Sequence, residues 1–139
     1  MTDLQKCHVL LVEDNPLNQL LGKAMLEHCG CRVDVAANGR EAVDASGRQR
    51  YDLIFMDCQM PVMDGHEATA AIRAREEGDP EGRQNPRTPV VALTAYDSDE
   101  DREQCRLSGM DDYISKPFNL ATIQATVEKW FTSRPPVRR

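Results

Sequence analysis

The sequence lacks several features that would assign it to a specialised class of protein. Only 5% of its 139 residues are aromatic, and acids outnumber bases, giving a net charge of −6 and an isoelectric point near 5.0. A surplus of negative charge gives no general affinity for nucleic acid or for anionic membrane surfaces. Every apolar run is shorter than the roughly 18 residues that a membrane-spanning helix needs. We therefore expect no nucleic-acid binding and no membrane association.

The sequence also has no sign of secretion or of a disulfide framework. The first residues, MTDLQKCHVLLVEDN, lack the basic start and the small-residue cleavage site of a secretory signal, so we expect a cytoplasmic protein. Its five cysteines form no C-x-x-C pair and have no histidine at zinc-finger spacing. Cys29 and Cys31 are too close together for an ordinary disulfide. The cysteines are interpreted as reduced thiols that serve as small apolar residues.

Short apolar runs alternate with helical patterns along the chain. Five runs have the composition of strands: residues 8–12, 32–37, 52–57, 90–95 and 110–115. Five helices are expected after them, over residues 15–28, 40–47, 64–76, 98–109 and 119–131. The runs lack strict alternation of apolar and polar residues, so both of their faces should be buried. The sequence therefore predicts a doubly wound α/β fold, in which helices cover both faces of a five-stranded parallel sheet.

The chain has the length of one domain, and its composition changes at two places only. Residues 76–89 contain three prolines and two glycines and are predicted to form an extended surface loop. Residues 132–139 are predicted to be a frayed tail. We therefore interpret residues 1–139 as a single domain with a core at about 8–131.

Polar side chains follow four of the expected strands at their carboxyl ends, where sheets of this kind bind ligands. The residues at these ends are Glu13, Asp14, Asp57, Thr94 and Lys116. Crowded carboxylates repel one another and favour a cation. A hard divalent ion with oxygen ligands suits them, and Mg²⁺ is the expected choice. Its expected ligands are the three acids and the backbone carbonyl of Cys58.

A magnesium ion that keeps open positions for phosphate points to phosphoryl transfer. Asp57 is then the candidate nucleophile and would form an aspartyl phosphate. Thr94 and Lys116 offer a hydroxyl and an ammonium group to the phosphoryl oxygens. Taken alone, Asp14 could be a helix cap and Lys116 a solvated surface charge. Their occurrence together at four strand ends favours a shared site.

Four segments resemble the receiver domain of two-component response regulators: VLLVEDNPLNQ, MDCQMPVMDG, ALTA and YISKPF. The resemblance covers nearly everything from Val9 to Phe131, and VEDNPLNQLL is most similar to the receivers of hybrid sensor histidine kinases. It implies a flavodoxin-like sheet with strand order 2-1-3-4-5. It also implies a cis peptide bond between Lys116 and Pro117.

The resemblance further implies a phosphorylation switch. Asp57 would take a phosphoryl group from a histidine kinase or a histidine-phosphotransfer protein, with Glu13 and Asp14 holding Mg²⁺. Thr94 would move toward the phosphate and Tyr113 would turn into the vacated space, which changes the face around Tyr113. In the alternative interpretation, Tyr113 is an ordinary half-buried strand residue. Some receivers dimerise through this face, so a phosphorylation-linked dimer stays open.

The first expected helix has more apolar surface than a helix lying on a sheet needs. One stripe contains Leu17, Leu20, Leu21, Ala24 and His28, and a second contains Met25, Leu26 and Cys29. We hypothesise that Leu17 and Leu20 dock the histidine-phosphotransfer protein or kinase domain. The alternative is a wide core face beneath the long loop.

Two other functions compete with the switch. A magnesium-dependent hydrolase with an aspartyl-phosphate intermediate would use similar parts, but haloacid-dehalogenase-like enzymes place an acid two residues after the nucleophile. Here that residue is Gln59, which cannot act as a general acid or base. A degenerate receiver would bind partners without phosphorylation, and the complete residue set argues against it.

Whether the domain is an enzyme stays open, since a receiver catalyses only its own phosphorylation and dephosphorylation. It could be a stand-alone regulator or the receiver of a hybrid kinase.

Overall fold

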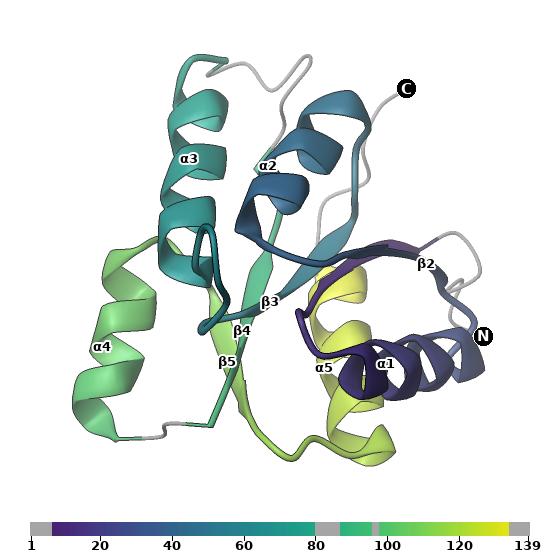
Figure 1. Cartoon of the computed structure of the whole chain (residues 1–139). Helices are drawn as coiled ribbons and strands as arrows, with labels where there is room; N and C mark the ends of the chain where they lie inside the picture. The colour runs from purple at the N-terminus through teal and green to yellow at the C-terminus, as the bar shows by residue number, and fades with distance from the viewer. Residues whose placement is uncertain (1–6, 80–86, 96–97, 134–139) are drawn as a thin grey trace.

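The computed structural model describes residues 7–79, 87–95 and 98–133. Strands and helices alternate along the chain, as predicted (Figure 1). The strands are β1 (His8–Val12), β2 (Arg32–Ala36), β3 (Leu53–Asp57), β4 (Val90–Thr94) and β5 (Asp112–Ser115). The helices are α1 (Pro16–His28), α2 (Gly39–Arg48), α3 (Gly65–Glu77), α4 (Asp99–Leu107) and α5 (Leu120–Ser133). Among the described residues, no helix combines the length and apolarity needed to cross a bilayer.

The five strands form one parallel sheet in the order β2-β1-β3-β4-β5, which confirms the predicted doubly wound fold. The chain passes from β1 outward to β2 and then crosses back over β1 to β3. The strand order therefore reverses between β1 and β3, and the carboxyl ends of these two strands are neighbours. Ligands of such sheets bind at this switch point.

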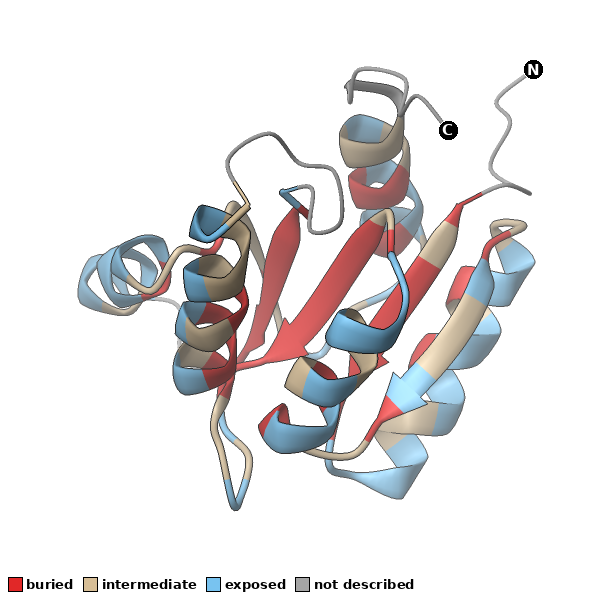
Figure 2. Cartoon of the chain, turned by 90° about the horizontal axis from the view of Figure 1, so that it is seen from above, coloured by how far each residue is buried: buried red, intermediate tan, exposed pale blue. Residues whose placement is uncertain are grey.

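Helices cover both faces of the sheet because successive strand residues point to opposite sides. Helices α1 and α5 lie on one face, and α2, α3 and α4 lie on the other (Figure 1). The core beneath α1 and α5 includes Leu11, Leu26, Phe55, Leu93, Ile114 and Val127. The core beneath α2, α3 and α4 includes Leu10, Ala42, Ile54, Ile72, Ala92 and Cys105. The central strands are buried along their whole length (Figure 2), which explains why they read as continuous apolar runs.

Side-chain caps set where the helices begin. The Oδ1 atom of Asn15 accepts the N–H groups of Leu17 and Asn18, and Pro16 occupies the first helical position of α1. Asp64 before α3 and Ser98 before α4 each take part in a capping box. These caps are the signals that made the helix starts readable from sequence.

Several predicted boundaries differ from the observed ones by one or two residues, and two of them affect β5 and the long loop. The strand expected over 110–115 begins at Asp112, because the N–H of Met110 bonds to the carbonyl of Cys105 and closes the end of α4. The helix expected over 64–76 runs from Gly65 to Glu77, so the loop predicted from residue 76 starts later. Residues 80–86 of that loop and residues 134–139 of the tail lie outside the described residues.

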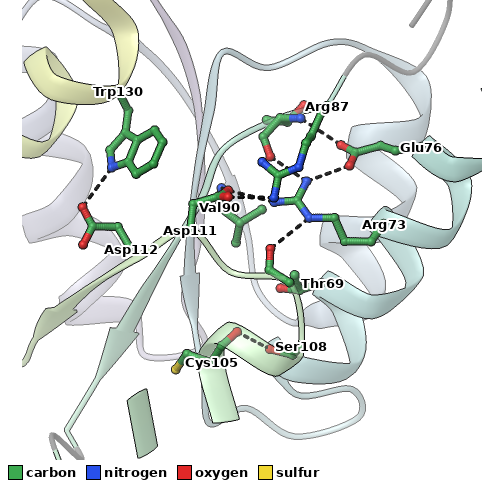
Figure 3. A network of polar contacts seen from close by, with 12 residues as sticks. Thr69, Arg73, Glu76, Arg87, Val90, Cys105, Ser108, Asp111, Asp112 and Trp130 are labelled. Carbon is green, nitrogen blue, oxygen red and sulfur yellow. Dashed lines mark hydrogen bonds and ion pairs between the residues drawn. The ribbon is translucent and has the colours of Figure 1, made fainter. Parts of the chain in front are cut away.

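A polar network fastens α3 to the segment before β5 (Figure 3). The guanidinium group of Arg73 donates to the carbonyl of Gly109 at 2.9 Å and to the carboxylates of Glu76 and Asp111 at 2.7 and 2.9 Å. On the other side of β5, the indole N–H of Trp130 donates to Asp112 at 2.9 Å (Figure 3). These bonds hold α3 and α5 at fixed positions relative to β5.

Candidate functional site

The sheet brings the predicted acids together at the carboxyl ends of β1 and β3. Val12 pairs with Met56, so Glu13 and Asp57, each the next residue along its strand, lie side by side. Glu13 is 0% exposed and Asp57 only 3% exposed, although both carry carboxyl groups. Buried charges need partners, since an unpaired charge away from water is very costly. Both acids have the same partner, a side chain on the residue that follows β5.

Lys116 bridges the two buried acids. Its Nζ atom lies 3.0 Å from Oε1 of Glu13 and 3.0 Å from Oδ2 of Asp57. Burial alone would lower the pKa of Lys116, but its hydrogen bonds to Glu13 and Asp57 outweigh burial and raise the pKa above its ordinary value. The ammonium group therefore stays charged at neutral pH and faces the carboxylate of Asp57.

Backbone contacts tie the end of β4 to both neighbouring segments. The N–H of Cys58 donates to the carbonyl of Leu93 at 3.0 Å, and the N–H of Lys116 donates to the carbonyl of Thr94 at 2.7 Å. Thr94 is itself buried at the last position of β4. The structure thus places Thr94 at the same edge of the sheet as Asp57 and Lys116. The peptide bond from Lys116 to Pro117 is cis, as predicted.

The acids form a cluster of oxygen atoms that could hold a cation. One carboxylate oxygen each from Glu13, Asp14 and Asp57 lies within 4.8 Å of the other two. Asp14 is exposed while the other two acids are buried, so the cluster has one open side. An all-oxygen donor set with an open side fits Mg²⁺, which keeps several water ligands.

The carbonyl of Cys58 lies at the start of the turn after β3. It accepts the N–H of Gly65 at 3.2 Å, and a carbonyl oxygen has a second lone pair that this bond leaves open. Asp57 is also held from this turn, because its Oδ1 atom accepts the N–H of Gln59 at 3.1 Å. One carboxylate oxygen of Asp57 therefore faces the backbone and the other faces Lys116.

Sequence reasoning missed two supports of the site. A Cβ atom added to Gly65 would lie 2.2 Å from the carbonyl oxygen of Asp57, so the chain can pass this close only as glycine. The side chain of Gln19 donates to the carbonyl of Glu13 at 2.7 Å. The Asp-Gly pair at 64–65 suggested a turn but not this contact, and nothing in the sequence pattern singles out Gln19.

Tyr113 lies half-buried on β5 and packs against the core beneath α2, α3 and α4. The guanidinium carbon of Arg102 on α4 lies 4.5 Å from the centre of the Tyr113 ring, which is the geometry of a cation–π contact. Tyr113 thus connects β5 to α4. Its inward turn on phosphorylation stays a prediction.

The structure decides between the two interpretations of α1. Leu17 and Leu20 are 63% and 67% exposed, so the alternative of a wide core face is wrong. The physical reason is Gly22, because a Cβ atom there would lie 2.8 Å from the side chain of Leu11. The helix approaches the sheet on the side of Gly22 and Leu26, which leaves the stripe of Leu17 facing outward.

Comparison with known proteins finds matches over almost the whole chain. Residues 9–128 match the family model described as the response regulator receiver domain. The chain is 43% identical over 122 residues to the sensor protein GacS of Pseudomonas syringae pv. syringae, and 88% of the chain is covered. It spans only 13% of the length of that protein, and 15% of the length of a probable histidine kinase from Oryza sativa subsp. indica.

Solved structures of receiver domains are similar to this chain both in fold and in sequence. The receiver domain of sensor histidine kinase PA1611 from Pseudomonas aeruginosa PAO1, which holds a magnesium ion in its active-site cleft, is 46% identical with a TM-score of 0.80. That match covers 91% of this chain and 98% of the other. The chain also matches the co-crystal structure of the Saccharomyces cerevisiae histidine phosphotransfer protein Ypd1 with the receiver domain of Ssk1. This match has 36% sequence identity and a TM-score of 0.87, and it covers 94% of this chain and 92% of the other.

Proposed function

The chain belongs to the response regulator receiver family, and on that premise we propose that it is a phosphorylation-dependent signalling switch. Asp57 accepts a phosphoryl group from the phosphohistidine of a histidine kinase or a histidine-phosphotransfer protein. The observation that carries this proposal is the ammonium group of Lys116, 3.0 Å from two buried carboxylates beside an open acidic cluster. A site with this charge distribution attracts a metal ion together with a phosphoryl group.

The chemistry is a displacement at phosphorus. A carboxylate oxygen of Asp57 forms a bond to the phosphorus atom while the bond from phosphorus to the donor imidazole breaks, and the imidazole leaves with the electron pair. Lys116 and Thr94 bind the phosphoryl oxygens and stabilise their charge. Glu13, Asp14, Asp57 and the carbonyl of Cys58 would hold Mg²⁺, which neutralises the charge of the acids and of the phosphoryl group.

The signal leaves the site through the face around Tyr113. Movement of Thr94 toward the phosphoryl group makes room for the Tyr113 ring, which then turns inward. In the present structure, the Tyr113 ring contacts Arg102 of α4. Turning inward would break that contact and change the surface formed by α4, β5 and α5. The same face is where a phosphorylation-linked dimer would form, and sedimentation of the phosphorylated chain would detect it.

The donor docks on the exposed apolar stripe of α1. Leu17 and Leu20 stand at the start of α1, a few residues after Glu13 and Asp14 in the chain, and both are exposed. Val62, in the turn after Asp57, is also exposed and apolar. We infer that these side chains surround the rim of the site and bind the helix that carries the donor histidine.

The relatives and the thiols of the chain support a proposal for the setting of the domain. Residues 1–139 would work as one receiver domain, either within a hybrid kinase such as those it resembles or as a stand-alone regulator. All five cysteines are thiols, although the sulfurs of Cys58 and Cys105 lie only 3.7 Å apart. Thiols persist in reducing compartments, which supports a cytoplasmic location.

One experiment separates the switch from the two competing functions. The chain is incubated with Mg²⁺ and acetyl phosphate, and its intact mass is measured. A gain of one phosphoryl group, absent in Asp57→Asn, supports the switch. Sustained turnover of phosphate esters without labelling would instead indicate a hydrolase, and no adduct at all would indicate a degenerate receiver.

A further inference from the structure

Two cysteines and a histidine meet beneath the site, two of them from the turn after β3 and the start of α3, and the third from α4, which is distant in sequence. Cys58 follows β3, His66 lies in the first turn of α3, and Cys105 lies on α4. One ligand atom from each lies within 4.8 Å of the other two. Both cysteines are 5% exposed, and His66 is partly exposed. We propose that Cys58, His66 and Cys105 form a binding site for a thiophilic metal ion, with Zn²⁺ as the expected occupant.

The spacing of the two sulfur atoms suits such an ion. They lie 3.7 Å apart. Two thiolates on a tetrahedral zinc ion, each at about 2.3 Å from the metal, are separated by about 3.8 Å. A metal ion could therefore enter between the sulfurs without their moving apart. Three protein ligands leave the fourth position to water.

The hydrogen bonds of Ser108 prepare the histidine as a ligand. The hydroxyl of Ser108 donates its only proton to the carbonyl of Cys105 at 2.9 Å (Figure 3). The same oxygen lies 3.0 Å from Nδ1 of His66, and it accepts from Nδ1 when the ring carries its hydrogen on that nitrogen. In that tautomer of the neutral ring, Nε2 has a free lone pair that can bind a metal ion. Histidine ligands are commonly fixed by this kind of outer hydrogen bond.

Binding exchanges protons for the metal and involves no electron transfer. An ordinary thiol is mostly protonated at neutral pH, and the thiolate is the form that binds a metal ion. When Zn²⁺ enters, two metal–sulfur bonds and one metal–nitrogen bond form, and two protons leave to the solvent. The competing interpretation is a pair of thiols that pack as small apolar residues.

An occupied site would join α4 to the residue that follows Asp57. This consequence rests on the proposed function, because it matters only if α4 shifts when Asp57 is phosphorylated. The metal would then bind one conformation of α4 more tightly and favour it. Metal binding itself is independent of that step and can be measured alone.

The test uses Co²⁺ as a spectroscopic probe for zinc. The full chain is titrated with Co²⁺ without oxygen, in a non-thiol reductant and with excess Mg²⁺ to occupy the acidic cluster. We expect thiolate-to-cobalt charge-transfer absorption that saturates at one ion per chain, disappears when Zn²⁺ is added, and accompanies the release of two protons. Absence of the band in the unaltered chain would overturn the proposal, and this result needs no variant to fold.

Variants assign the band to particular residues. Cys105→Ser removes one thiolate and should reduce the band by about half or more. Ser108→Ala should weaken binding by about 10- to 100-fold, the usual effect of losing an outer hydrogen bond. Cys29 lies outside the cluster, so Cys29→Ser should leave the charge-transfer band unchanged. A band that survives Cys105→Ser but is lost in Cys31→Ser would overturn the assignment. Labelling of Asp57 by acetyl phosphate is measured separately, so failure of one proposal is distinguishable from failure of the other.

Discussion

The Nζ atom of Lys116 lies 3.0 Å from Oδ2 of Asp57, although 59 residues separate the two in the chain. The contact exists because parallel strands deliver their carboxyl ends to one edge of the sheet. Glu13 shares the same ammonium group and is completely buried. Lys116 therefore stabilises the charges of both acids, and we propose that it also faces an incoming phosphoryl group.

The first prediction concerns the stability of this arrangement. Lys116→Met leaves the buried carboxylate of Glu13 without its cation and should lower the free energy of unfolding by about 3 kcal/mol. Millimolar Mg²⁺ should restore part of the loss, because we propose that it binds the same acids in the folded state. Denaturant unfolding with and without Mg²⁺ measures both effects.

Lys129→Met is the matched control. Lys129 also pairs with an acid, Asp112, at 3.2 Å, but its side chain is largely exposed to solvent. Exposed pairs contribute at most about 1 kcal/mol, so this variant should lose little stability and should not respond to Mg²⁺. Equal losses for the two variants would contradict a special role for Lys116.

The second prediction tests the close approach at Gly65. Gly65→Ala should lower the melting temperature and slow labelling of the chain by acetyl phosphate, because the added Cβ displaces the backbone of Asp57. Gly78→Ala, at the other end of α3, places its Cβ at an ordinary 3.4 Å from the nearest atom. The control should leave labelling unchanged, and similar behaviour of the two variants would show that the contact at Gly65 is unimportant.

Much of this structure could be predicted from the sequence because its signals are local. Continuous apolar runs gave the strands, and Asn15 with Pro16 gave the start of α1. The rule that ligands bind at the carboxyl ends of parallel strands predicts that Glu13 and Asp57 lie together, and they do. The order of the strands came from the resemblance, since local patterns do not specify which strands pair.

What could not be predicted depends on contacts between distant segments. The packing of Gly22 against Leu11 decides which side of α1 faces the sheet, and helical spacing left both sides open. Cys58 and Cys105 are 47 residues apart and have no metal-site spacing, so only the fold brings their sulfurs together. The start of β5 differs from the prediction because Met110 bonds back to α4.

The third prediction concerns pH and uses the only tryptophan of the chain. Burial would raise the pKa of Asp112, but hydrogen bonds from Trp130, the backbone of Tyr113 and Lys129 outweigh it and lower the pKa below 3.8. The folded pKa is below the unfolded one, so the stabilisation is present above pH 3.8 and is lost as the pH falls through the folded value. Trp130 fluorescence should therefore change only below pH 3.8.

Asp112→Asn supplies the comparison for that titration. The amide keeps the shape of the side chain but cannot ionise, so the acid transition of Trp130 fluorescence should disappear. A wild-type transition with its midpoint above pH 3.8 would contradict the direction of the pKa shift. Persistence of the transition in the variant would show that another group causes it.

The fourth prediction concerns the docking stripe. Changing Leu17 and Leu20 together to serine should slow phosphotransfer from a histidine-phosphotransfer protein by about tenfold or more, since two apolar contacts are lost. Labelling by acetyl phosphate should be unchanged, because that small donor needs no docking surface. Leu107→Ser removes an equally exposed leucine from the end of α4 and should leave phosphotransfer rates as they are. Unchanged rates in the double variant, with folding intact, would exclude docking at this stripe.

The most direct test of the central claim is to locate the phosphoryl group. The chain is labelled with acetyl phosphate in Mg²⁺, digested, and searched by mass spectrometry for the modified residue. We predict one acyl phosphate, on Asp57, that does not form when Mg²⁺ is withheld. A phosphoryl group on any other residue, or an unmodified Asp57 after complete coverage of the chain, would contradict the account.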